Sequence, residues 1–205
     1  MVLHIHPENP EPRKIAQLAE ILRKGGVVIV PTDSVYAFVC SLEQYRGFEQ
    51  VCRLKGIRPD KAKFSILCTD LSNISAYTKP FDRSVYKMLN KALPGPYTFI
   101  LEAGNEVPSL FRNRRKTIGL RVPDHPIVQS LIAEVGCPLV ASSLHDDDEI
   151  TPYPTDPEEI AGKWVNRVDV VVDGGFGHNT PSTVIDCSGD EPVVIREGAG
   201  SLDVL

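Results

Sequence analysis

Polar side chains stand directly after the first buried strand that the sequence predicts. The stretch at 27–40 reads "VVIVPTDSVYAFVC": an apolar run breaks at a proline into Thr32, Asp33 and Ser34, and Tyr36 follows. Because ligands of α/β proteins bind outside the ends of parallel strands, these hydroxyl and carboxyl groups are candidates for a binding site. A strand followed by a helix cap would use the same residue types, so this stretch alone leaves both interpretations open.

Two arginines interrupt runs that are otherwise apolar. Arg121 lies within "TIGLRVP", and Arg196 closes the run "PVVIR". Burying a guanidinium is costly unless it meets a carboxylate or an anionic ligand. The sequence is consistent both with a buried partner, such as Asp186 or Glu197, and with a bound anion.

Hydroxyl side chains recur at the ends of later predicted strands. Ser142 and Ser143 close "PLVASS", and Ser182 and Thr183 follow a glycine-rich loop and open "STVID". They repeat the pattern of Thr32 and can face a ligand, although each pair alone is also typical of a turn or a helix cap.

Two clusters of basic residues offer further contacts for an anion. The first lies between a predicted helix and a predicted strand and contains Arg53, Lys55, Arg58, Lys61 and Lys63. The second contains Arg112, Arg114, Arg115 and Lys116. Lysine and arginine are the usual partners of phosphate, but solvated loops have the same composition. The formal net charge of −5 argues against a surface that is basic throughout and leaves room for a local basic patch.

Cysteine and histidine placement argues against a metal site of the protein's own. The five cysteines form no CxxC pair, and the five histidines make no ligand pair with them at a familiar spacing. The odd number of cysteines, several in or beside strand-like runs, predicts buried free thiols in a reducing compartment. No apolar stretch approaches the length of a membrane span and no signal peptide opens the chain, so we expect a cytoplasmic protein without membrane contacts.

Alternating patterns predict the scaffold that positions these residues. Helices are predicted at 14–23, after a capping box at 41–44, after Asp70, at 83–93, at 126–135 and from 155 to about 164. Strands are predicted at 27–30, 64–68, 97–101, 117–122, 139–142, 168–173, 183–187 and 193–196. This alternation, with adjacent strands near the C-terminus, predicts one α/β domain over residues 1–205 with a mixed sheet and flanking helices.

Six short motifs, in their order along the chain, resemble the YrdC-like domain of the threonylcarbamoyl-AMP synthase family. They are "PTDSVY", "KGIRP", "PGPYTFIL", "IGLRVPDHP", "PLVASS" and "PSTVID…VVIREG", and they cover about residues 12–200. The family's usual patterns there are P-T-E-T-V-Y-G, K-x-R-P, P-G-P-x-T, R-V-P, T-S-A-N, S-T-V-V-D and R-x-G. The chain's length, its N-terminal "HPENP" and its departures from these patterns resemble most the short YciO-type branch of that family.

The resemblance implies a fold, a reaction and a set of site residues. The family has a twisted α/β sheet with a concave cavity, and it joins L-threonine, bicarbonate and ATP, accompanied by Mg²⁺, into threonylcarbamoyl-AMP for the t6A modification of tRNA. By motif position, threonine would be held by Thr32, Arg121 and Ser182. The nucleotide would be held by Lys55, Arg58, Thr117, Ser143, His145 and Arg196. The resemblance assigns no catalytic residue. We expect six of these residues to converge on one cavity: Thr32, Arg58, Arg121, Ser143, Ser182 and Arg196.

Departures from the family patterns bear on that activity. Lys55 lies three residues before Arg58 instead of two, with Gly56 in the usual lysine place, so a one-residue bulge would be needed to restore it. His145 stands where the family has asparagine, and the four carboxylates at 146–149 would repel a triphosphate if they lined the pocket. We therefore expect a weak or altered synthase, or a hydrolase of a related acyl-adenylate. The alternative is an RNA-binding module for tRNA or double-stranded RNA that uses the concave surface without catalysis.

Overall fold

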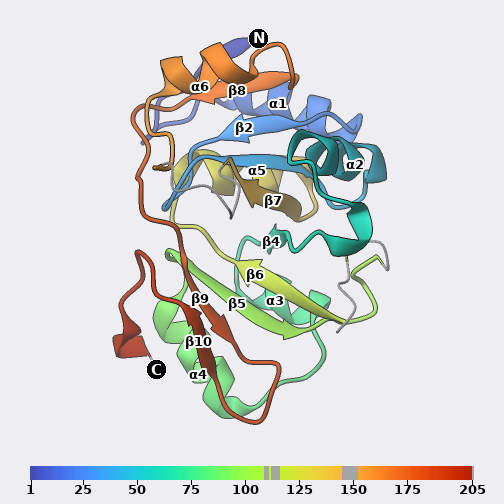
Figure 1. Cartoon of the computed structure of the whole chain (residues 1–205), viewed down its shortest axis with the longest axis vertical. Coiled ribbons are helices and arrows are strands. Elements are labelled where there is room, and N and C mark those ends of the chain that lie inside the picture. The colour runs from blue at the N-terminus through green and yellow to red at the C-terminus, as the bar shows by residue number, and fades with distance from the viewer. Residues whose placement is uncertain (109–110, 112–115, 145–151, 205) are drawn as a thin grey trace.

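The computed structural model describes residues 1–108, 111, 116–144 and 152–204. In this part of the chain, ten strands form one sheet in the order β1-β8-β2-β3-β7-β4-β6-β5-β9-β10 (Figure 1). The strands are Val2–His4 (β1), Val28–Val30 (β2), Ala37–Ser41 (β3), Ser65–Leu67 (β4), Tyr97–Glu102 (β5), Thr117–Arg121 (β6), Leu139–Ser143 (β7), Val170–Asp173 (β8), Thr183–Asp186 (β9) and Val193–Arg196 (β10). Parallel and antiparallel pairs both occur, which confirms the predicted mixed sheet.

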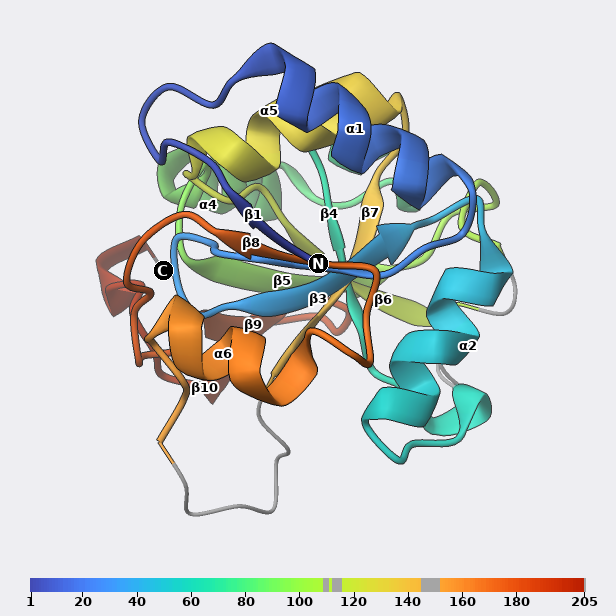
Figure 2. The same cartoon turned by 90° about the horizontal axis from the view of Figure 1, so that it is seen from above.

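Helices cover both sides of the sheet. They are Pro12–Arg23 (α1), Tyr45–Leu54 (α2), Leu71–Tyr77 (α3), Arg83–Ala92 (α4), Pro126–Val135 (α5) and Pro157–Trp164 (α6), with short 3₁₀ turns at Pro59–Lys61 (η1) and Leu202–Val204 (η3). Figure 2 shows α1 beside α5 on one side and α2 and α6 on the other. None of the helices in the described residues is long and apolar enough to cross a membrane.

Each helix layer seals one side of the hydrophobic core. On the α1 and α5 side, Leu18 and Leu131 pack in the same buried cluster as Val28 of β2. On the other side, Trp164 of α6 packs edge-on against Phe38 of β3, with ring centroids 4.8 Å apart. Burial of these apolar faces supplies the main driving force that holds the helices on the sheet.

The stretch after β2 forms a hairpin, and the helix-cap interpretation is wrong. Strands β2 and β3 pair antiparallel, with Val30 opposite Ala37. The loop between them is closed from within, because Thr32 Oγ1 accepts from the backbone N–H of Ser34 at 3.1 Å and donates to the carbonyl of Val35 at 2.8 Å. Strand β3, which is buried along its whole length, was not predicted.

The predicted capping box that begins at Ser41 is also wrong. Ser41 is the last residue of β3, and its hydroxyl accepts from the backbone N–H of Glu43 at 3.2 Å. Helix α2 begins after Gln44, whose side chain makes no capping bond. Asp70 does cap α3 as predicted, by accepting from the backbone N–H of Asn73 at 2.7 Å. Strand β1, short and largely exposed, had no sequence signal.

All five cysteines are buried free thiols, which confirms the prediction made for Cys40, Cys68 and Cys187. Burial raises the pKa of Cys68 to about 12 and that of Cys187 to about 11. The thiolate forms of Cys68 and Cys187, which are the reactive species, are therefore scarce at neutral pH. We expect that Ellman's reagent modifies none of the five thiols rapidly in the native protein and all five in guanidinium chloride. A thiol that reacts rapidly before denaturation would contradict this expectation.

Candidate functional site

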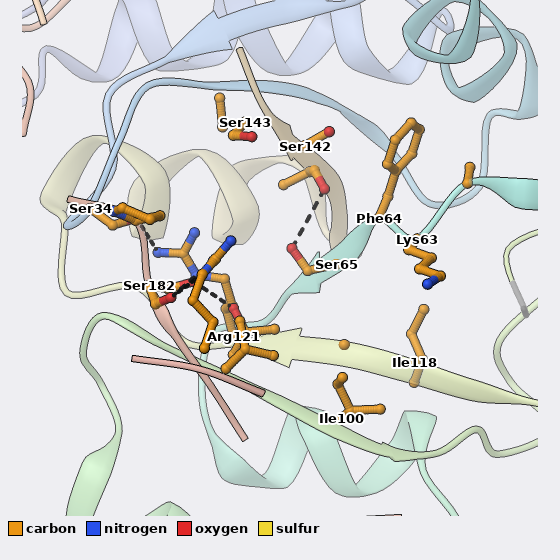
Figure 3. A pocket seen from close by; sticks show the side chains of 18 of the residues that line it. Ser34, Lys63, Phe64, Ser65, Ile100, Ile118, Arg121, Ser142, Ser143 and Ser182 are labelled. Carbon is orange, nitrogen blue, oxygen red and sulfur yellow. Dashed lines mark hydrogen bonds between the residues drawn. The ribbon is translucent and has the colours of Figure 1, made fainter. Parts of the chain in front are cut away.

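A cavity of about 530 Å³ lies over the centre of the sheet (Figure 3). Its floor is built from small residues on neighbouring strands. Ser65 of β4 pairs with Gly119 of β6 and with Ala141 of β7, and Ala37 of β3 pairs with Ser143 of β7. Directly opposed residues of paired strands lie on one face of a sheet. Because these five residues carry at most two side-chain heavy atoms, that face is hollow where larger side chains would fill it.

Ile66 of β4 and Leu120 of β6, which directly follow the floor residues Ser65 and Gly119, are large and fully buried. Side chains alternate between the two faces of a strand, so these residues point away from the cavity floor. Phe99 of β5, which pairs with Leu120, is fully buried as well. The strands therefore keep a complete core beneath the cavity.

Arg121 is held at one end of the cavity by the hairpin loop. Its Nη2 donates to Asp33 Oδ1 at 2.6 Å and to Ser34 Oγ at 3.0 Å. The side chains of Arg121 and Asp33 are 8% and 7% exposed, and Asp33 also accepts from the backbone N–H of Asp124 at 2.9 Å. The Nε of Arg121 is buried and makes no hydrogen bond with a described residue. This end therefore presents a fixed guanidinium with unused donor capacity, which suits a carboxylate or phosphate oxygen.

The electrostatic environment of Arg121 is net positive. Burial lowers the pKa of Arg121 below its ordinary value; the Asp33 carboxylate opposes the shift, and the nearby charge of Arg196 adds to it. The guanidinium stays protonated in spite of this shift, because its ordinary pKa lies far above neutral. Arg121 and Arg196 therefore lie close enough to interact, and Asp33, paired with Arg121, balances only one of the two positive charges, which favours an added anion.

Arg196 has no carboxylate partner among the described residues. Its Nε and Nη2 donate to the carbonyl of Ser182 at 3.1 and 2.9 Å, and the Ser182 hydroxyl lies 2.8 Å from Thr98 Oγ1. The suggested partners Asp186 and Glu197 are wrong for both arginines. Arg121 pairs with Asp33, and Arg196 donates to the Ser182 carbonyl. The charge of Arg196 is thus available to a ligand.

Six of the nine residues that the resemblance assigned to the site line the cavity. They are Lys55, Thr117, Arg121, Ser143, Ser182 and Arg196. The expectation that Thr32 and Arg58 join them is wrong. The hydroxyl of Thr32 closes the hairpin loop, and its neighbour Ser34 lines the cavity instead. The side chain of Arg58 is 74% exposed and pairs with Asp60.

Some predicted residues fall outside the described part of the chain. His145 and the carboxylates at 146–149 are among them, and so are Arg112, Arg114 and Arg115 of the second basic cluster. The expected effect of the acidic run on the nucleotide stays a prediction, and so does the RNA-binding alternative.

Lys55 reaches the cavity in spite of its displaced position in the sequence. Gly56 adopts a left-handed conformation with φ 66° just after α2, and the N–H of Ile57 bonds back to the carbonyl of Cys52 at 2.9 Å. This pattern is typical of a helix that ends at a glycine. The Nζ of Lys55 then donates to the carbonyl of Ser143 at 3.0 Å. The extra residue before Arg58 is therefore absorbed by the glycine turn.

Sequence reasoning missed most of the cavity floor. Strand alternation counted back from Arg121 would have placed Gly119 and Thr117 on its face. No comparable signal marks Ser65 or Ala141, because their place opposite Gly119 depends on the order and register of the strands.

Every charged residue in the described lining of the cavity is basic. These residues are Lys55, Lys61, Lys63, Arg121 and Arg196. Within the described ranges, no group of three or more His, Cys, Asp or Glu side chains is placed to hold a metal ion. The lining does not fit a magnesium site of the protein's own, since Mg²⁺ in proteins prefers carboxylate and phosphate oxygens. A Mg²⁺ ion would enter with a triphosphate as part of the substrate.

Comparisons with known proteins place this chain among related sequences. The family model for Sua5, YciO and YrdC proteins, described as telomere recombination, matches residues 20–198. The chain is 43% identical over 201 residues to the uncharacterized protein YciO of Escherichia coli, covering 97% of this chain and 96% of the relative. It is 32% identical over 187 residues to the threonylcarbamoyl-AMP synthase of Bacillus subtilis, covering 90% of this chain and 53% of the relative.

Solved structures give the same relationships. The crystal structure of E. coli YciO superposes with a TM-score of 0.93 at 40% identity, covering 100% of this chain and 98% of that one. The crystal structure of P. abyssi Sua5 complexed with L-threonine superposes with a TM-score of 0.87 at 26% identity, covering 97% of this chain and 57% of that one. The predicted fold class is confirmed by both.

Proposed function

This chain belongs to the Sua5/YciO/YrdC family, and we propose that it is an ATP- or adenylate-binding relative of the threonylcarbamoyl-AMP synthases with weak or altered activity. The observation that carries the proposal is the cavity of about 530 Å³ whose charged lining, in the described residues, is wholly basic. Its volume lies in the range of small-molecule sites. A cavity lined by one sign of charge concentrates ligands of the opposite sign, here a ligand with several negative charges.

In this proposal, the Arg121 end of the cavity binds the carboxylate of L-threonine. Arg121 would use the donors that Asp33 leaves free, and the Ser182 hydroxyl lies close by. Thr32 acts on this end only through the loop that presents Ser34. A related family member, P. abyssi Sua5, has been solved with L-threonine, which supports an amino-acid substrate here.

The remaining lining residues would hold the nucleotide. Lys55, Thr117, Ser143 and Arg196 supply cations and hydroxyls along the cavity. In the proposed reaction, the amine of threonine condenses with bicarbonate to a carbamate and water leaves. A carbamate oxygen then attacks the α-phosphorus of ATP, and pyrophosphate leaves. Positive charges fixed in advance around the phosphates would stabilise the charge that develops in that step.

The proposal is tested by pyrophosphate release from ATP as a function of threonine and bicarbonate at fixed Mg²⁺. We expect release that depends on threonine and is slower than that of the B. subtilis synthase assayed in parallel. An acyl-adenylate hydrolase would instead release AMP from threonylcarbamoyl-AMP without making it. A protein that binds no ATP by calorimetry and releases no pyrophosphate would contradict the proposal.

Replacing Arg196 with alanine is expected to weaken ATP binding about tenfold or more. The substitution removes a charged hydrogen-bond donor from a partly buried site, a loss of about 1.5–3 kcal/mol. Isothermal titration calorimetry measures the change, with Arg13→Ala on the exposed surface of α1 as a control that removes the same charge. Equal ATP affinity in Arg196→Ala and the wild type would show that Arg196 does not contact the nucleotide.

A further inference from the structure

Two lysines at the edge of the cavity have no side-chain partner in the described residues. Lys61 ends the 3₁₀ turn η1, and Lys63 follows it just before β4. Both line the cavity, and both are exposed to solvent. An unpaired lysine on the surface is common, but two that border one cavity raise its positive potential together.

The strand register puts Lys63 far from Arg121. Thr117 and Arg121 stand at the two ends of β6, which separates them by about 13 Å at about 3.3 Å per residue. Ser65 lies opposite Gly119, so continuing the register brings Lys63 beside Thr117. Figure 3 shows Lys63 next to Phe64, across the cavity from Arg121 and Ser182. The cavity therefore has a cationic region at each of two separated ends.

Arg58, the arginine that the family motif assigns to the nucleotide, is turned away from this end. Its Nε and Nη2 donate to the two carboxylate oxygens of Asp60 at 3.0 and 3.2 Å. This two-point pair fixes the plane of the guanidinium. Lys61 and Lys63 follow Arg58 in the same segment and line the cavity, whereas Arg58 does not. The two lysines therefore supply the positive charge at this edge of the cavity.

We infer that Lys61 and Lys63 form a subsite for an oligophosphate chain, in the role that the motif gives to Arg58. The inference rests on the proposed function for the identity of the ligand as a nucleoside triphosphate. With the amino acid at Arg121, the α-phosphate lies between the two ends, and the β- and γ-phosphates extend toward Lys61 and Lys63. Lysine ammonium groups on flexible stems contact phosphate oxygens as point charges. The subsite would thus distinguish a triphosphate from a monophosphate.

The test uses the full-length protein, with inorganic tripolyphosphate and AMP as separate probes in isothermal titration calorimetry. We expect the double variant Lys61→Ala/Lys63→Ala to bind tripolyphosphate about tenfold more weakly, as the loss of two exposed charge contacts predicts, and AMP about as well as the wild type does. Raising the salt concentration should reduce the difference, because exposed charges are screened. Thermal melting checks that the variant remains folded, which the exposure of both lysines favours.

The matched control is Arg53→Ala/Arg58→Ala, which removes two positive charges from the same segment without changing the cavity lining. It should bind both probes like the wild type. An equal loss of tripolyphosphate affinity in the control would overturn the inference. Unchanged tripolyphosphate affinity in the lysine variant would overturn it too, and so would a wild-type protein that binds no tripolyphosphate. A parallel loss of AMP affinity would also overturn it. Failure of threonine-dependent pyrophosphate release would instead count against the proposed function, since the tripolyphosphate measurement does not depend on turnover.

Discussion

Replacing Asp33 with alanine is expected to lower the free energy of unfolding by about 3–5 kcal/mol, the usual loss when one partner of a buried ion pair is removed. Arg121 would then keep its charge at 8% side-chain exposure and lose its one carboxylate partner among the described residues. The backbone N–H of Asp124 would lose its acceptor as well. Urea unfolding followed by circular dichroism measures the change as a shift of the midpoint.

The exposed ion pair of the same chain provides the matched control. Asp60→Ala breaks the pair with Arg58, whose side chains are 45% and 74% exposed, so we expect a loss of about 1 kcal/mol or less. Combining Asp33→Ala with Arg121→Met should recover part of the large loss, because no uncompensated charge stays buried. If Asp33→Ala unfolds at the wild-type urea concentration, Asp33 does not compensate Arg121 and the proposed orientation of the guanidinium is wrong.

This ion pair changes the interpretation of the polar stretch after the first predicted strand. The sequence indicated a ligand-binding floor made of Thr32 and its neighbours. In the structure, Thr32 closes the loop and Asp33 orients Arg121, so among these residues only Ser34 lines the cavity. Residues that looked like direct ligand contacts therefore act mainly by positioning the arginine that faces the ligand.

The fold could be predicted where one periodicity dominates. Helix α1 buries Ile15, Leu18, Ala19 and Leu22, as the apolar spacing indicated, and α5 ends at Gly136 in a left-handed conformation, as expected of a terminal glycine. The same reasoning missed β3, although β2, which is buried on both faces as well, was predicted from its apolar run. It also failed for β1, which is too short and exposed to leave a pattern.

Site residues could be predicted where a charged side chain interrupts an apolar run of the sequence. Arg121 and Arg196 were found because a guanidinium in an apolar run requires a partner. Arg58 was wrongly assigned to the cavity. Its side chain pairs locally with Asp60, and the motif alone does not indicate that pair. Small residues of the floor were missed because the absence of a side chain becomes informative only once the strand register is known.

Replacing Gly119 with leucine is expected to reduce ATP affinity by about a hundredfold or more, equivalent to about 2.7 kcal/mol or more of binding free energy. Gly119 lies at the centre of the cavity floor. A Cβ atom there would stand 3.2 Å from Thr98 Cγ2 and 3.6 Å from Ser65 Cβ, so the rest of the leucine side chain must extend into the cavity. Calorimetric titration with ATP measures the effect, and thermal melting checks the fold.

Two further glycine variants separate blocked binding from a damaged protein. Gly119→Ala adds only the methyl group, which Thr98 can accommodate by a small shift, so we expect ATP binding within a few-fold of wild type. Gly162→Leu adds the same side chain as the test variant on α6, where nothing beyond the neighbouring residues and the helix's own backbone lies within 4 Å of the added Cβ, and should leave binding unchanged. If Gly119→Leu binds ATP as tightly as both controls do, the nucleotide occupies another surface, and the proposed function loses the cavity on which it depends.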